Sequence, residues 1–265
     1  MDNKRAPRIV YAGDRAIAVK VLRFIAGEGV LPEVLLVTDA KRASHAEELK
    51  SLCGHLDGSR ILEGSKFSKK EGLDLLSSVR PDYILCIHFP YIVTKEVLAI
   101  PSRGVLNLHP AYLPYNRGWH TPTWAIWDGT PYGATLHFMD EGVDTGDIVH
   151  QKRITVSPDD TADSLYKRVL DLEFEVFKEA WPSLVKGTYE RRPQPGSGGT
   201  FHTKTDIERI REFDPAGDRT EIARKLRALT TNSMEEAAYM KIDGRIYRMQ
   251  VKVSEDMRND PKKRP

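Results

Sequence analysis

The stretch Gly104-Val105-Leu106-Asn107-Leu108-His109-Pro110 decides the fold, because it joins an apolar, strand-like run to polar side chains at its end. Asn107 and His109 are two positions apart, so on an extended backbone both side chains leave the same face. Burying such groups is costly, and no structural need for them is evident before Pro110. We therefore expect a functional site at the carboxyl end of this strand, rather than a strand end whose polar groups are merely satisfied.

Strand-like and helix-like segments alternate on both sides of this stretch. The strand-like segments up to residue 108 are almost wholly apolar, which is typical of a parallel sheet covered on both faces. In such a sheet the ligand site lies at the carboxyl ends of the strands. The sequence thus predicts a Rossmann-like α/β domain. The expected strands are 8–12, 34–37, 60–62, 83–87, 105–108, 134–139 and 148–154, and the expected helices are 16–25, 45–52, 70–79 and 159–184.

A Pro/Gly-rich stretch at 192–199 is the best candidate for a domain boundary. Beyond it, 220–229 predicts a helix, and the turn Asp243-Gly244 between two apolar runs predicts a hairpin. The end of the chain is too charged to pack. We expect a parallel-sheet domain at 1–190, a linker at 191–215, a small C-terminal α+β subdomain at 216–255 and a frayed tail at 256–265.

Composition excludes several classes of protein. Forty basic and thirty-eight acidic residues give a formal charge of +2, which supplies no overall electrostatic drive toward nucleic acid and leaves open only a local basic patch. The two cysteines, Cys53 and Cys86, are far apart and form no CxxC pair, which argues against a disulfide framework or a structural zinc and favours a reducing compartment. The most apolar stretch, 83–93, is too short to span a bilayer. We expect a soluble cytoplasmic protein.

A second feature is the acidic, glycine-containing loop 140–147, DEGVDTGD. Together with Asn107 and His109, a carboxylate at Asp144 completes the groups needed to move an acyl group onto an amine. The amide and imidazolium stabilise negative charge on a carbonyl oxygen, and the carboxylate orients the imidazole or relays a proton. Glycines and aspartates also suit a plain turn. Metal binding is a third reading, which the spacing does not favour.

The segments GVLNLHPAYLPYNRGWH (104–120) and GATLHFMDEGVDTGDIVHQ (133–151) together resemble the signature of the folate-dependent formyltransferases. This family includes glycinamide ribonucleotide transformylase, methionyl-tRNA formyltransferase and the nucleotide-sugar N-formyltransferases. The resemblance covers residues 7–190. It implies that Asn107, His109 and Asp144 form the catalytic triad.

The resemblance also implies that the donor is 10-formyltetrahydrofolate and that no metal is needed. The loop at 140–144 would hold the pteridine, and the segment after the strand 83–87 would line the same pocket, although core packing explains each apolar residue there equally well. A catalytic role for His88 does not fit the spacing of the triad. The residues expected on the donor side are Ile87, Phe89, Tyr91, Ile92, Asp140 and Glu141.

Two segments are candidates for the acceptor side. The turn 13–15 opens a helix, whose N-terminus can attract phosphate, but it lacks the glycine-rich loop of the purine-pathway enzyme. In the segment 115–120, Arg117 can bind a phosphate or carboxylate. The alternative is a helix that packs its tryptophans into the core. The residues expected on the acceptor side are Gly13, Asp14, Arg15, Tyr115, Arg117, Trp119 and His120.

The variant NRGWHTPTWAIWDGTPYG (116–133) resembles the sugar enzymes more than the tRNA enzymes. We therefore expect formyl transfer to the primary amine of a nucleotide-linked amino-deoxysugar. A methionyl-tRNA formyltransferase-like enzyme is the first alternative and would need a basic C-terminal module. A non-catalytic Rossmann-like ligand-binding protein is the second, and the intact triad argues against it. The expected partners are folate, a nucleotide sugar and a second copy bound through the C-terminal hairpin, with neither membrane nor nucleic acid.

Overall fold

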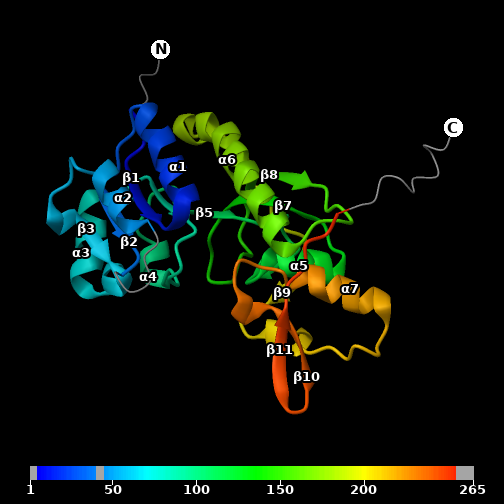
Figure 1. Cartoon of the computed structure of the whole chain (residues 1–265). Coiled ribbons are helices and arrows are strands. Elements are labelled where there is room, and N and C mark those ends of the chain that lie inside the picture. The colour runs from blue at the N-terminus through cyan, green and yellow to red at the C-terminus, as the bar shows by residue number, and fades with distance from the viewer. Residues whose placement is uncertain (1–4, 40–44, 255–265) are drawn as a thin grey trace.

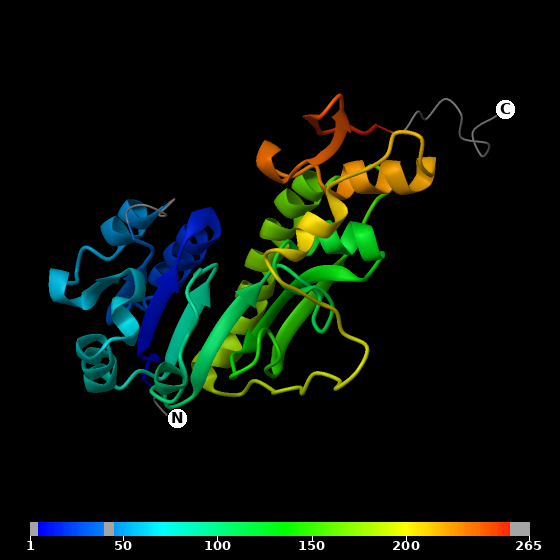
Figure 2. The same cartoon turned by 90° about the horizontal axis from the view of Figure 1, so that it is seen from below.

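The computed structural model describes residues 5–39 and 45–254, so the expected tail at 256–265 lies outside the described residues. Within the described part, a seven-stranded sheet of order β3-β2-β1-β4-β5-β7-β8 forms the centre of the fold (Figures 1 and 2). Its strands are β1 (Ile9–Gly13), β2 (Val34–Val37), β3 (Ile61–Glu63), β4 (Tyr83–Ile87), β5 (Gly104–His109), β7 (Tyr132–Phe138) and β8 (Ile148–Ile154).

The Rossmann-like α/β prediction is confirmed for the first five strands, which pair in parallel from β3 to β5. The sheet as a whole is mixed, because β7 pairs antiparallel with both β5 and β8. An all-parallel sheet would need a long crossover between β7 and β8. Here the short loop after Phe138 connects them directly, so β8 returns alongside β7.

Alternating side chains of the strands face two hydrophobic cores. The helices are α1 (Arg15–Gly27), α2 (Ala46–Leu52), α3 (Lys70–Val79), α4 (Lys95–Leu98), α5 (Thr121–Asp128), α6 (Ala162–Lys186) and α7 (Arg219–Ala228), with 3-10 turns at η1 (Gly58–Arg60), η2 (Gly64–Ser68), η3 (Asp206–Ile210) and η4 (Met234–Glu236). In β4, Tyr83, Leu85 and Ile87 face the core under α1, α2 and α6, whereas Ile84 and Cys86 face the core under α3 and α4. This alternation is the period of two expected of a buried strand.

The helix α6 supports the half of the sheet that carries the candidate site. It starts with a capping box, in which Thr161 and Ser164 each bond the other's backbone N–H. It packs against β5, β7 and β8 and reaches α1 (Figure 1). The apolar positions predicted from the sequence, such as Val169, Val176 and Phe177, are fully buried. One helix therefore joins the parallel and antiparallel parts of the sheet.

The C-terminal part packs on α5 through a small core that contains Trp124, Ile210, Leu229 and Ala238. The predicted hairpin is confirmed: β10 (Ala238–Ile242) and β11 (Arg245–Met249) pair antiparallel across a two-residue turn. It lies at the end of the molecule remote from β3 in Figures 1 and 2. None of the helices in residues 5–39 and 45–254 is long and apolar enough to cross a membrane.

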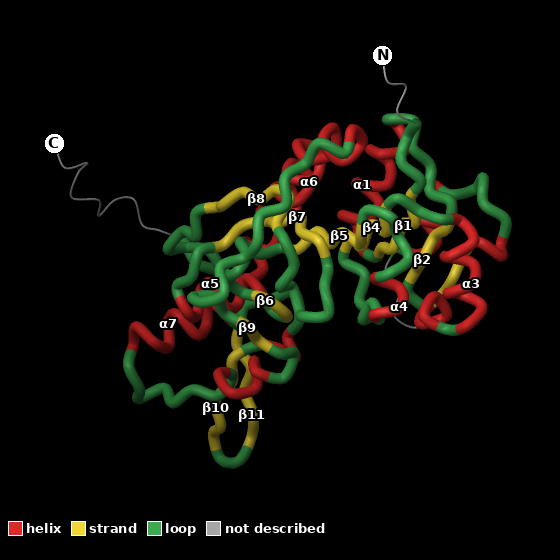
Figure 3. Tube along the Cα trace, turned by 180° about the vertical axis from the view of Figure 1, so that it is seen from behind, coloured by secondary structure: helices red, strands yellow, loops and turns green. Residues whose placement is uncertain are grey.

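The segment predicted as a linker, 191–215, contains regular structure. It carries η3 and the short strand β9 (Phe201–His202), which pairs in parallel with β6 (Arg117–Gly118), as Figure 3 shows from behind. The chain therefore returns from α6 to the loop that follows β5. The domain boundaries themselves remain a prediction.

Candidate active site

The candidate site is built on paired ends of β5 and β7. Asn107 and His109 alternate with Leu106 and Leu108, which face α6, so the two polar side chains lie on the other face of the sheet. The antiparallel register places His137 directly opposite Asn107. A third polar side chain, which the sequence did not single out, thus joins the predicted pair.

Asp144 reaches this face from the loop between β7 and β8. Its Oδ1 accepts a hydrogen bond of 3.3 Å from Nδ2 of Asn107 and lies 3.6 Å from Nε2 of His137. Its Oδ2 lies 3.5 Å from Nε2 of His109 and accepts a 2.9 Å hydrogen bond from the backbone N–H of Gly118. The structure therefore brings Asn107, His109 and Asp144 together around one carboxylate.

The backbone of this loop is specialised for presenting Asp144. Asp144 has φ of +54°, in the left-handed region that non-glycine residues seldom adopt. At Gly146 a Cβ would overlap the carbonyl oxygen of Phe138, so a larger residue would displace the loop from β7. Asp140 closes the loop by accepting hydrogen bonds from the N–H of Gly142 and the hydroxyl of Thr145. The glycines and Asp140 are thereby accounted for by loop geometry.

Burial and the neighbouring groups determine which of Asp144 and His109 is charged. Burial alone would raise the pKa of Asp144, but the nearby His109 and the N–H of Gly118 hold that pKa well below its usual range. The pKa of His109 is lowered from 6.5, because burial outweighs the opposing effect of Asp144. At neutral pH the ligand-free site therefore holds an ionised carboxylate beside a neutral imidazole. The sequence suggests an imidazolium at His109. This geometry instead favours the neutral ring in the ligand-free site.

Hydrogen-bond partners fix the tautomers of the two histidines. Nε2 of His109 faces only acceptors, the carboxylate of Asp144 and the carbonyl of Asn116 at 3.4 Å, so it carries a hydrogen. Nδ1 is then the basic nitrogen of the neutral ring. Nδ1 of His137 faces the carbonyl of Phe138 at 2.8 Å and must donate to it. Its Nε2 can then accept from Nδ2 of Asn107, 3.2 Å away.

The residues expected on the donor side have different environments. Ile87 is fully buried in the core under α6 and does not face the site. Phe89 and Tyr91 pack edge-on against Phe67, and the Tyr91 hydroxyl donates to Asp39 at 2.6 Å. In contrast, Ile92 is 89% exposed.

Glu141 forms an exposed ion pair of 3.1 Å with Lys95 of α4. This contact joins the Asp144 loop to the segment that follows β4, where the aromatic cluster of Phe89 and Tyr91 lies. Among the described residues, no group of three or more His, Cys, Asp or Glu side chains is arranged to hold a metal ion.

The turn 13–15 lies at the same edge of the sheet, two strands away from β5. Gly13 packs closely on Ala18, Asp14 is buried, and the backbone N–H of Asp14 donates to the carbonyl of Ile87. Arg15, with φ of +66°, donates to the hydroxyl of Tyr166 on α6 at 2.9 Å. The contacts of this turn are therefore with β4 and α6 rather than with Asp144.

His88 belongs to the same α6-facing network. Its Nε2 lies 2.9 and 3.0 Å from the two carboxylate oxygens of Glu173, which is fully buried, and its Nδ1 lies 3.4 Å from the hydroxyl of Tyr166. This agrees with leaving His88 out of the triad.

The segment 115–120 adjoins the carboxylate of Asp144 through Gly118. Tyr115 is half-buried in the turn before it. Arg117 is half-buried, and its Nε is buried with no hydrogen-bond partner among the described residues. Trp119 is 45% exposed, with Nζ of Lys204 at 5.3 Å from its ring centre. A half-buried guanidinium and an exposed ring thus stand next to the cluster around Asp144.

His120 starts α5 and lies 3.9 Å from Glu236, and burial lowers its pKa. Both tryptophans of α5 pack against the core. Trp124 is buried and stacks on His202 with ring centres 3.8 Å apart, and Trp127 is half-buried. The segment therefore combines exposed and packed aromatic residues.

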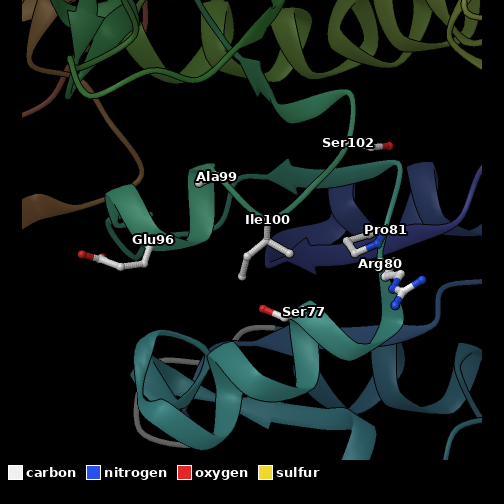
Figure 4. Close-up of a pocket in the computed structure, with 7 residues that line it drawn as sticks. All are labelled: Ser77, Arg80, Pro81, Glu96, Ala99, Ile100 and Ser102. Atoms are coloured by element: carbon white, nitrogen blue, oxygen red, sulfur yellow. The ribbon is translucent and has the colours of Figure 1, made fainter.

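A hollow of about 310 Å³ lies elsewhere, at the ends of β4 and β5 where the chain enters the sheet (Figure 4). Arg80, Glu96, Ser77 and Ser102 are among its lining residues. It is at the opposite edge of the sheet from His109, and we assign it no role.

The neutral state of His109 is directly testable. In a nuclear magnetic resonance titration of the histidine-labelled protein, we expect its midpoint below the ordinary value of 6.5, because burial penalises the charged ring. The signal is identified by its loss in His109→Asn. A midpoint above 6.5 would mean that Asp144 outweighs burial and would contradict this assignment.

Comparisons with known proteins agree with this geometry. Residues 29–181 match the family model for formyl transferase. The methionyl-tRNA formyltransferase of Myxococcus xanthus is 32% identical over 84% of this chain and 73% of that protein. The dTDP-4-amino-4,6-dideoxyglucose formyltransferase of Mycobacterium tuberculosis is 31% identical over 63% of this chain and 70% of that protein.

Solved structures share the whole fold. A 4-N formyltransferase from Francisella tularensis has a TM-score of 0.79 at 23% identity, covering 94% of this chain and 98% of that one. An N-formyltransferase from Helicobacter canadensis, solved with folinic acid and dTDP-3-aminofucose, has a TM-score of 0.68 at 22% identity, covering 90% and 85%. The resemblance expected from the two sequence segments is therefore confirmed, and the chain belongs to the formyl transferase family.

Proposed function

We propose that this enzyme transfers a formyl group from 10-formyltetrahydrofolate to the primary amine of a nucleotide-linked amino-deoxysugar. The observation that carries the proposal is the cluster in which the Asp144 carboxylate contacts Asn107 and His109 in a formyl transferase chain. This cluster contains an amide donor, a basic nitrogen and a buried charge, which are the groups that acyl transfer to an amine requires.

In the proposed mechanism the amine attacks the formyl carbon, a C–N bond forms, and the carbonyl becomes an oxyanion. The neutral His109 takes a proton from the attacking nitrogen, and Asp144 stabilises the imidazolium that results. The two amide hydrogens of Asn107 are directed to Asp144 and His137 in the ligand-free site, and one of them turns to the oxyanion when it forms. The C–N bond to the folate then breaks, and the proton passes to the departing nitrogen. Since the base is the neutral ring, activity should be lost as the pH falls through the lowered pKa of His109.

For the donor, the proposal assigns a reduced folate to the space between the Asp144 loop and the segment after β4. The folinic acid in the Helicobacter structure supports this ligand class. Exposed Ile92 offers an apolar wall, and Phe89 and Tyr91 stiffen the segment that carries it. Asp140 and Glu141 shape the loop, while Ile87 supports the pocket from the core.

For the acceptor, the proposal assigns the phosphates and base to the side of Arg117 and Trp119. The half-buried guanidinium of Arg117 suits an anionic oxygen, and the exposed ring of Trp119 suits a planar or sugar ring. Tyr115 and His120 border this segment. The turn 13–15 contacts α6, so we place it further from the amine. The Mycobacterium tuberculosis relative, whose name states a dTDP-amino sugar, supports this class.

Methionyl-tRNA is the second candidate acceptor, favoured by the 32% identity to the Myxococcus enzyme. Binding tRNA would need basic residues displayed towards phosphates. In the C-terminal part, however, Nζ of Lys225 donates to the carbonyl of Glu212, and Arg227 donates to the carbonyls of Asp160 and Ser157. These cations bind the protein's own backbone. We therefore retain the sugar acceptor.

The test supplies carbon-labelled 10-formyltetrahydrofolate with a panel of amino-deoxysugar nucleotides beside charged initiator tRNA. We expect label in a sugar nucleotide, with a shallow dependence on salt because two phosphates release few counterions. Efficient labelling of the tRNA with none of the sugars accepted would overturn the acceptor. No labelled product with any amine, despite folate binding, would favour a non-catalytic ligand-binding protein.

We also propose that the enzyme is a homodimer formed through the hairpin β10–β11, in a cytoplasmic setting consistent with its two free cysteines. The hairpin exposes Ile242, Ile246 and Tyr247 by 45%, 52% and 43%. Exposed apolar side chains on a projecting element are typical of an interface.

Light scattering should report a dimer whose dissociation is promoted by Ile246→Asp. Leu31→Asp, at an equally exposed leucine near β2, is the matched control and should leave the mass unchanged. A monomeric wild-type protein at all concentrations would contradict the dimer.

A further inference from the structure

The chain that follows α6 runs along the loop that carries Asp144. The backbones of Arg192 and Ile148 exchange two hydrogen bonds, of 2.8 and 2.9 Å. Nε of Arg191 donates to the carboxylate of Asp147 at 2.9 Å. A segment that composition suggests is a linker is therefore fastened to the base of the loop.

Gln194, in the middle of the Pro/Gly-rich stretch, forms two side-chain hydrogen bonds to the backbone of this loop. Its Nε2 donates to the carbonyl of Asp144 at 2.9 Å and to the carbonyl of Gly146 at 2.8 Å. A carboxamide nitrogen carries two hydrogens, so one side chain can hold both carbonyls at once. These carbonyls flank the turn in which Asp144 has its left-handed conformation.

We propose that Gln194 is a positioning residue of formyl transfer, which locks the backbone of Asp144 so that its carboxylate faces His109. The kinetic part of this inference rests on the proposed function. Gln194 touches neither His109 nor Asn107 and acts through Asp144. Its own Oε1 is buried and has no hydrogen-bond partner among the described residues, so its two N–H groups alone orient the amide.

The rest of the segment supports the second loop of the site in the same way. The hydroxyl of Thr200 accepts a 2.7 Å hydrogen bond from the backbone N–H of Asn116. At Gly199 a Cβ would lie 2.6 Å from the carbonyl oxygen of Pro114, so the chain can pass this close only as glycine. Because β9 then pairs with β6, the N–H of Gly118 is fixed for its bond to Asp144. Residues 191–202 thus brace both the backbone and the side chain of Asp144.

The test compares Gln194→Met with Gln250→Met. Methionine keeps the length of the side chain and removes both N–H donors. Gln250 is a matched control, since its Nε2 also donates to two carbonyls two residues apart, those of Thr231 and Ser233, in the C-terminal part. We expect Gln194→Met to lower kcat on the order of 10²-fold, because a small displacement of a reacting group is enough for such a loss. KM should stay near the wild-type value, and Gln250→Met should keep the wild-type kcat.

A second readout is independent of any acceptor. The groups that act on His109 are Asp144 from the loop, His137 from β7, Glu173 from α6 and the carbonyl of Asn116, and Gln194 restrains Asp144 alone. If Asp144 moves away, the pKa of His109 should fall further in the titration of Gln194→Met. Gln250→Met should titrate like the wild type.

An unchanged kcat in Gln194→Met, an unchanged His109 titration, or an increase in KM alone would each overturn the positioning role. If Gln194→Met does not fold, Gln194→Asn serves instead, because it keeps the amide but is too short to reach both carbonyls. It should show the same losses. A wild-type protein that formylates none of the acceptors would refute the proposed function, while the titration would still test the position of Asp144.

Discussion

The burial of one carboxylate, that of Asp144, is the constraint on which the site depends. A charge removed from water is tolerated only when donors surround it. Here the donors come from different parts of the chain: the side chains of Asn107 and His109 at the end of β5, and the N–H of Gly118 in β6. The fold therefore holds the end of β5, the strand β6 and the loop after β7 together around the carboxylate of Asp144.

The same burial determines the chemistry available. An ionised Asp144 beside a neutral His109 is suited to general-base catalysis. The neutral imidazole can accept a proton, and the carboxylate of Asp144 is already in place to stabilise the cation that forms. His137 completes the cluster by fixing the amide of Asn107 through a ring nitrogen whose role is set by the carbonyl of Phe138. The amide is then oriented before any ligand arrives, as electrostatic preorganisation requires.

Local patterns predicted much of the fold. The apolar runs at β2 and β4 and the helical period at α3 predicted those elements with their observed bounds, since each pattern reflects burial of a single segment. The close approach of Asp144 to Asn107 and His109 was expected from the family resemblance. What the sequence could not supply was pairing between distant segments. The register that sets His137 opposite Asn107 depends on the antiparallel return of β7, and the role of Gln194 depends on the path taken after α6. The Pro/Gly-rich composition around Gln194 predicted a linker. Composition does not show which other segments a stretch of chain contacts, so the hydrogen bonds of Gln194 could not be predicted.

The central claim is that Asp144 acts through His109, as one unit, in formyl transfer. A double-mutant cycle tests it most directly, with turnover measured for His109→Ala, Asp144→Asn and the double variant in the labelled-formyl assay. Groups that act as a unit are strongly non-additive, so the double variant should be about as slow as the slower single variant. If the two losses multiply instead, each residue contributes independently, and the claim that the buried pair acts as one unit is contradicted.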